Sequence, residues 1–292
     1  MTAPNPPLIR QAILAGRFYD GNPQRLRAQV RDWLDTGAER TKAATSAKMA
    51  EGRAPWGLML PHAGHVYCGN VLGATLKGVT LPRTLVIICP NHTGRGQAFG
   101  VWPSGAWLTP LGAVPVNQAL ATALIAQPPF AADVQSHAGE HSIEVLLPFV
   151  QEAAGATQAD ACPAIVPVCV GTQNFAALTQ AGQALAEVLR QHEDIGVIVS
   201  SDMNHFADVE TTNKLDQMAL DKALAAEPRA FLETIQRERI SMCGAGPLTL
   251  ALTAMHCLGT PGVEYVCHDT SATASGDGRR VVGYAGLRLF VE

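Results

Sequence analysis

The chain has 292 residues, of which 47% are apolar and 16% are charged, and its formal net charge is −4 at pH 7. This is the composition of a globular protein that is long enough to bury a large core. The acidic balance argues against a surface for nucleic acid or anionic membrane, because both attract basic proteins. Because the chain has no apolar run of 18 residues, we expect no membrane span. Seven cysteines without a CxxC pair, and no signal-peptide pattern, favour the cytoplasm.

The first half of the chain predicts a strand–helix–strand unit followed by a hairpin. In chain order, the patterns predict a helix over 22–37, a polar loop over 38–54, a strand over 56–60, a crossover helix over 68–79, a strand over 84–89, a hairpin or meander over 98–117 and a helix over 117–126. The apolar runs are short and continuous, which is typical of strands covered on both faces.

The second half continues the alternation. The patterns predict a helix over 140–153, a strand over 164–171, an amphipathic helix over 175–192, a strand over 195–200, helices across 213–258 with a break at 241–247, and closing strands over 263–269 and 279–292. Alternating strands and helices predict one α/β domain over 1–292. We expect a mostly parallel central sheet with helices on both faces and some antiparallel strands.

Polar residues follow three of the predicted strands directly. They are His62 after the first, Asn91 and His92 after the second, and Ser201, Asp202 and His205 after the strand at 195–200. In open α/β sheets, ligands bind beyond the carboxyl ends of the strands, so these side chains are expected to meet. Cys243, in the loop at 241–247, can join them.

Imidazole, thiolate and carboxylate groups are ligands of first-row transition metals. Two histidines on neighbouring strand ends, with a third ligand from a distant loop, would leave open positions on the metal. This arrangement suits Fe(II) oxygen chemistry or Lewis-acid zinc. Asp202 and His205 would then support the ligands or act as an acid–base pair.

Further candidates lie around these residues. They are His65, Asn91, His137, His141 and Glu144. In the helix predicted at 140–153, His141 and Glu144 stand one turn apart, opposite the apolar face. A solvated helix face is the simpler interpretation of that pair.

Eight segments together resemble the Memo family, whose bacterial and archaeal members are also called AmmeMemoRadiSam system protein B. In order, they are "AGRFYDG", "PHAGHVYCG", "PNHTGRG", "TPLGAVPV", "EHSIEVLLPF", "SSDMNHF", "MCGAGP" and "SGDGRRVVGYAGL". The resemblance implies a fold similar to the class III extradiol dioxygenases, which are non-haem iron enzymes.

The resemblance also implies a metal site and partners. The family's metal ligands fall on His62, His92 and Cys243, and its aspartate and histidine fall on Asp202 and His205. The metal implied is a single divalent ion, most readily iron, with copper and zinc as alternatives. Neighbouring genes in bacteria suggest a radical-SAM protein and an AMMECR-type protein as partners.

Two departures limit what the resemblance implies. Cys243 stands where the dioxygenases have a glutamate, and a softer thiolate changes metal preference, so ring cleavage does not carry over. His65 occupies a position that is often aromatic in the family. It could be a fourth ligand or a proton relay, but we favour the interpretation that it begins a helix and hydrogen-bonds to the backbone.

Three functions are compatible with these residues. The first is an iron-dependent, dioxygenase-like oxidoreductase, in which Asp202 orients His205 for proton transfer. The second is an adaptor whose cleft binds a peptide or protein, as eukaryotic family members do, with the metal as a modulator. The third is thiol catalysis by Cys243 with His62 or His92 as base. We rank it last because it leaves one histidine without a role.

Overall fold

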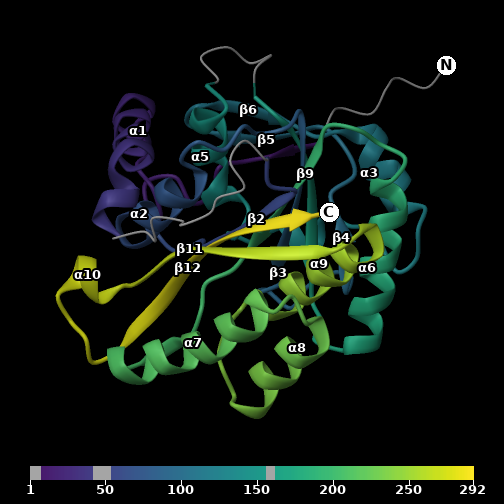
Figure 1. The fold of residues 1–292 in the computed structure, drawn as a ribbon. Helices are drawn as coiled ribbons and strands as arrows, with labels where there is room; N and C mark the ends of the chain where they lie inside the picture. The colour runs from purple at the N-terminus through teal and green to yellow at the C-terminus, as the bar shows by residue number, and fades with distance from the viewer. Residues whose placement is uncertain (1–7, 42–53, 156–161) are drawn as a thin grey trace.

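The computed structural model of the protein describes residues 8–41, 54–155 and 162–292. Within these ranges, a nine-stranded sheet forms the centre of the molecule (Figure 1). Its strand order is β10 (His205–Ala207), β12 (Val281–Val291), β2 (Gly57–Leu60), β9 (Ile195–Ser200), β3 (Thr84–Pro90), β8 (Ala164–Val170), β4 (Phe99–Val101) and β7 (Ala131–Ala132), and β11 (Pro261–Thr270) also pairs with β12.

The four middle strands are parallel, and antiparallel pairs flank them. β2 pairs with β9, β9 with β3 and β3 with β8 in parallel register, while β12 and β4 run antiparallel to β2 and β8. Every residue of β2 and β3 is buried, which explains their continuous apolar sequences. The carboxyl ends of β2, β3 and β9 therefore lie at one edge of the sheet.

Helices cover both faces of the sheet, which confirms the predicted fold class. On β12, Gly286 lies against Thr75 of α2 (His65–Leu76), whereas Gly283 lies against Asp216 of α7 (Val209–Leu224). Positions 283 and 286 point to opposite faces because side chains alternate along a strand. The other helices are α1 (Pro23–Arg40), α3 (Gln118–Ile125), α4 (Gln135–Ala138), η1 (Glu144–Leu146), α5 (Leu147–Ala153), α6 (Phe175–Leu189), α8 (Pro228–Arg237), α9 (Ala245–Leu258) and α10 (Ala272–Ser275).

Two predictions along the chain need adjustment. The hairpin expected over 98–117 is divided: β4 joins the main sheet, while β5 (Ala106–Thr109) and β6 (Gly112–Pro115) pair with each other, and β5 also pairs with β1 (Ile9–Arg10). The loop predicted over 38–54 begins later, because α1 continues to Arg40, and residues 42–53 lie outside the described residues.

The helix predicted over 140–153 is wrong in its first turn, and so is the solvated face assigned to Glu144. Helical structure begins only at η1, and Glu144 is fully buried. Its carboxylate pairs with Arg10 Nη1 at 2.5 Å and accepts hydrogen bonds from Tyr19 Oη at 2.6 Å and Leu14 N at 2.7 Å. Glu144 therefore fastens the N-terminal segment to the core, because a buried carboxylate must be paired. In the described part of the chain, no helix is long and apolar enough to cross a membrane.

Candidate metal centre

Three histidines meet at the carboxyl edge of the parallel strands. His62 lies just beyond β2, His92 just beyond β3, and His141 in the non-helical segment before η1. Their ligand atoms all lie within 4.8 Å of one another, and the rings of His92 and His141 stack with centroids 4.6 Å apart. His62 is buried, His141 is partly exposed and His92 is exposed, so the cluster reaches from the core to the surface.

Two serines fix the tautomer of His62. The hydroxyl of Ser200 donates its proton to the Ser142 carbonyl at 2.7 Å, so it can only accept at His62 Nδ1, which lies 2.7 Å away. The proton of the ring is therefore on Nδ1, and the lone pair is on Nε2. Burial lowers the pKa of His62 well below its usual range, which keeps the ring neutral and able to bind a metal.

Glu140 holds the other two histidines from behind. Its carboxylate accepts from His92 Nδ1 at 2.9 Å and from His92 N at 2.7 Å, and it lies 3.2 Å from His141 Nδ1. Burial opposes ionisation of this carboxyl, but hydrogen bonds from His141 and His92 outweigh it and lower its pKa. Carboxylates in this position orient metal-binding histidines and make them better ligands.

The histidine cluster differs from the ligand set predicted from the sequence. We expected Cys243 as the third member, whereas the structure groups His141 with His62 and His92. His141 belongs to the cluster because residues 140–143 are not helical, so its side chain is free to turn toward His92 and away from Glu144. The predicted pairing of His141 and Glu144 on one face is therefore wrong.

Cys243 still lies beside the cluster. Its Sγ is 3.3 Å from His62 Nε2 and accepts a hydrogen bond from Asp202 N at 3.2 Å. A nitrogen and a sulfur bound to one zinc-like ion are separated by about 3.1–3.6 Å, given bond lengths of about 2.0–2.3 Å. The donor chemistry and spacing thus fit a divalent transition metal held by imidazoles with a thiolate adjacent. Burial raises the pKa of the Cys243 thiol.

Asp202 and His205 are both near the cluster, but they are not hydrogen-bonded to each other. Asp202 is buried, and its Oδ1 accepts from the backbone N–H of His62 at 2.7 Å. His205 Nδ1 lies 2.8 Å from the carbonyl of Ser241, so it donates there and leaves the Nε2 lone pair free. Ser241, and not Asp202 as predicted, orients His205. Burial raises the pKa of Asp202, although the His62 N–H opposes the shift.

The remaining candidates hold the structure around the cluster. His65 begins α2, and its Nε2 lies 2.8 Å from the Val145 carbonyl. The Asn91 side chain closes its own loop, donating to the Arg95 carbonyl at 2.7 Å. His137 is buried, with Nε2 3.0 Å from the Gly100 carbonyl. None of these three belongs to the histidine cluster formed by the described residues.

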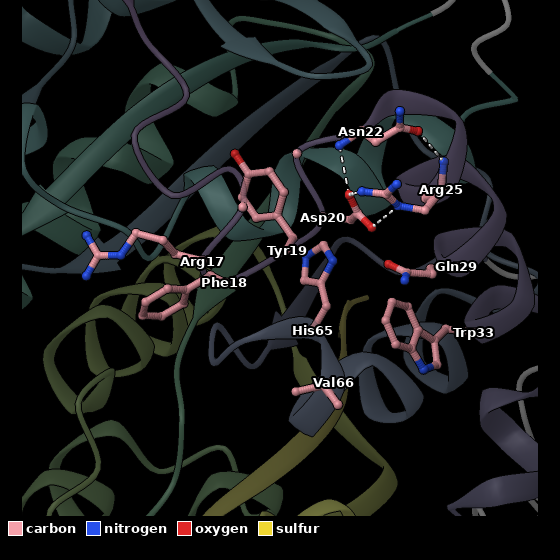
Figure 2. A pocket seen from close by; sticks show the side chains of 12 residues that line it. Arg17, Phe18, Tyr19, Asp20, Asn22, Arg25, Gln29, Trp33, His65 and Val66 are labelled. Atoms are coloured by element: carbon pink, nitrogen blue, oxygen red, sulfur yellow. Dashed lines mark hydrogen bonds and ion pairs between the residues drawn. The ribbon is translucent and has the colours of Figure 1, made fainter.

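Two cavities lie near the cluster, and one of them is lined by a cluster residue. One, of about 260 Å³, is lined by His92, Cys243 and the turn Gly171–Gln173. A larger one, of about 660 Å³, lies at the start of α1, where Asp20 pairs with Arg25 and His65 lies below Tyr19 (Figure 2). Phe18 lines the larger cavity, and its ring centroid is 5.2 Å from that of His141.

The fold and the cluster together define an α/β protein with a candidate metal centre at the carboxyl edge of parallel strands. Comparison with known proteins names the family: the Memo-like protein family model matches residues 10–288, and this chain belongs to the Memo family. It is 36% identical to a MEMO1 family protein of Thermotoga maritima over 96% of this chain and 99% of that protein. It is 32% identical to one from Methanopyrus kandleri over 95% and 98% of the two chains.

A solved structure supports the fold alone. The uncharacterized protein JW3007 of Escherichia coli K12 superposes with a TM-score of 0.53 at 15% sequence identity. The match covers 82% of this chain and all of the other. At this identity, the likeness says nothing about the chemistry of the centre.

Three residues that support the cluster were not predicted from the sequence. They are Glu140, Ser142 and Ser200. Glu140 and Ser142 flank His141 at the start of "EHSIEVLLPF", one of the segments that resemble the Memo family. A carboxylate or hydroxyl next to a histidine is the signal that could have identified them.

Proposed function

We propose that this protein is a mononuclear metal-dependent oxidoreductase of the dioxygenase-like type, with iron as the preferred metal and copper or zinc as alternatives. His62, His92 and His141 would hold the ion, with Cys243 as a fourth donor. The observation that carries the proposal is the fixed direction of the imidazoles. In each ring of the cluster Nδ1 faces a protein oxygen, which leaves Nε2 for the metal.

The other residues have supporting roles in this proposal. A metal bound there would supply Lewis-acid or redox chemistry. His205 would accept or donate a proton at Nε2, since its Nδ1 donates to Ser241. The carboxylate of Asp202 would hold His62 in place by accepting from its backbone N–H. The backbone N–H of Asp202 would hold Cys243 by donating to its Sγ. A small substrate would enter through the cavity of about 260 Å³ that reaches His92 and Cys243.

Elemental analysis tests the metal site. The purified protein is expected to hold about one equivalent of a transition metal, and the His62→Ala/His92→Ala double variant should lose it. The metal content of His141→Ala and that of Cys243→Ser, measured separately, show which of the two side chains binds the metal together with His62 and His92. His256→Ala is the matched control, because His256 on α9 bonds the Ala226 carbonyl at 2.7 Å and is absent from the cluster. Unchanged occupancy in the double variant contradicts the proposal.

Oxygen uptake tests catalysis separately. The protein is reconstituted with Fe(II) without oxygen and then supplied with oxygen and catechol-like substrates. Uptake that disappears in His205→Gln, with metal content unchanged, supports an oxidoreductase. A flat trace with every metal and substrate, despite full occupancy, would favour the alternative below.

The alternative is a non-catalytic adaptor in which the metal modulates binding of a peptide or protein. The cavity of about 660 Å³ favours it, because it is large enough for side chains of a partner and is lined by Phe18, whose ring lies beside that of His141. A radical-SAM protein and an AMMECR-type protein are the partners proposed from the family. Co-purification from cells expressing all three proteins, with and without Phe18→Ala, tests it. Thiol catalysis stays third, because burial raises the pKa of Cys243 and so disfavours a free thiolate.

A further inference from the structure

Phe206, next to His205, has a backbone conformation that bulky residues avoid. Its φ is 68°, in the left-handed region, and the pairing of β10 with β12 is irregular between His205 and Ala207. Its side chain is 63% exposed, so burial of the ring does not offset the backbone strain. Strain at such positions is concentrated at functional sites, and strand irregularities of this kind re-aim side chains beside them.

A hydrogen-bond network that runs from the surface to the buried Asp216 holds the residues just before Phe206. Ser241 Oγ accepts from His205 N at 2.7 Å and donates to Asn204 Oδ1 at 3.0 Å. Asn204 N donates to Asp216 Oδ1 at 2.8 Å, and the other oxygen of Asp216 lies 2.7 Å from His268 Nε2. A strained residue persists only where its surroundings determine its position. Ser241 and Asp216 of α7 hold the two residues that precede Phe206.

Arg280 lies over the exposed ring. Its guanidinium carbon is 4.7 Å from the centroid of Phe206, and the residue is exposed. The neighbouring Arg279 forms an ion pair with Asp277 at 2.8 Å, whereas Arg280 is in none of the ion pairs found among the described residues. Arg280 therefore brings to Phe206 a positive charge that has no carboxylate partner in the described part of the chain, and the ring of Phe206 lies 5.6 Å from that of His205 between centroids.

We propose that Phe206 and Arg280 form a subsite for an organic carboxylate that carries a planar apolar group. The carboxylate would pair with the guanidinium of Arg280, and the apolar group would lie against Phe206, which places the far end of the ligand toward His205. That this ligand is the substrate of the metal centre rests on the proposed function. Binding of the ligand at the subsite needs no metal.

Binding of benzoate and of its uncharged counterpart, benzamide, tests the subsite. The full-length protein is titrated with each probe, both as purified and after treatment with a chelator. Amide NMR signals of residues 204–207 and 280 are followed. Benzoate is expected to bind at these residues more tightly than benzamide. Arg280→Gln should weaken benzoate at least about fivefold and leave benzamide unchanged. Arg279→Gln is the matched control and should change neither.

Phe206→Gly provides a readout that a structural role would not give. Glycine adopts a φ of 68° without strain, so the variant should melt at the same temperature as the parent or about 2 °C higher, while affinity for both probes falls. A clear fall in melting temperature would mean that the ring stabilises the fold, and would overturn the inference.

Two further outcomes separate this inference from the proposed function. If benzoate fails to shift these amides, or binds equally to the parent and to Arg280→Gln, the subsite is refuted even when a metal is present. If benzoate binds as expected and elemental analysis finds no metal, the subsite stands and the metal-dependent function fails.

Discussion

Replacing Glu140 by glutamine should weaken both metal binding and the fold, by similar free energies. Oε1 accepts from His92 Nδ1 at 2.9 Å, from the backbone N–H groups of His141 and Ser142, and from Ser142 Oγ. Among the described residues, Oε2 accepts from His92 N alone. A glutamine can keep its oxygen at the Oε1 position, so its amide nitrogen would face the N–H of His92. Losing that one buried hydrogen bond costs about 1–3 kcal/mol of unfolding free energy.

The loss of negative charge behind His92 and His141 acts on the metal. Substitutions of carboxylates that support metal-binding histidines lower metal affinity by about 10–100-fold, which is about 1.4–2.7 kcal/mol. The assay is competition for zinc against a chromophoric chelator, with urea unfolding measured on the same samples.

Glu152→Gln is the matched control, because the Glu152 side chain is 2% exposed and binds Arg27 and Arg31 instead of a histidine. It should lose stability and keep its metal affinity. If Glu140→Gln retains the affinity of the parent, the assignment of Glu140 as the support of the metal ligands is refuted.

Three further predictions concern the fold. Glu144→Ala leaves Arg10 buried without its carboxylate and should cost about 3–5 kcal/mol, seen in calorimetry as a fall of about 10 °C; a fall below 2 °C would contradict the role given to this pair. Gly73→Ala should destabilise by about 1–3 kcal/mol, because a Cβ there overlaps the Trp33 backbone; unchanged urea unfolding would contradict that close approach. Burial lowers the pKa of His137 from 6.5 to about 4. As the pH falls below 6.5, the unfolded chain therefore takes up a proton before the folded protein does. The free energy of unfolding should then fall by about 1.4 kcal/mol per pH unit down to pH 4. His137→Phe should flatten unfolding free energy against pH by that amount, and an unchanged slope would show that another group titrates.

The sequence by itself determined the alternation of strands and helices and two of the three histidines in the cluster. Both follow from short-range patterns. Apolar runs at 56–60 and 84–89 predict buried strands, and the first polar groups after them, His62 and His92, must lie at the carboxyl edge because parallel strands end together.

Only the tertiary structure decided what stands behind and between those histidines. Glu140 contacts His92 across 48 positions of sequence, and Ser200 contacts His62 across 138. Periodicity cannot report such contacts, because it describes the faces of one element and says nothing about which distant element packs there. The same reason explains Glu144, whose position suggested a solvated helix face. Its partner Arg10 lies 134 residues earlier in the chain, and only folding brings the two charges together in the core.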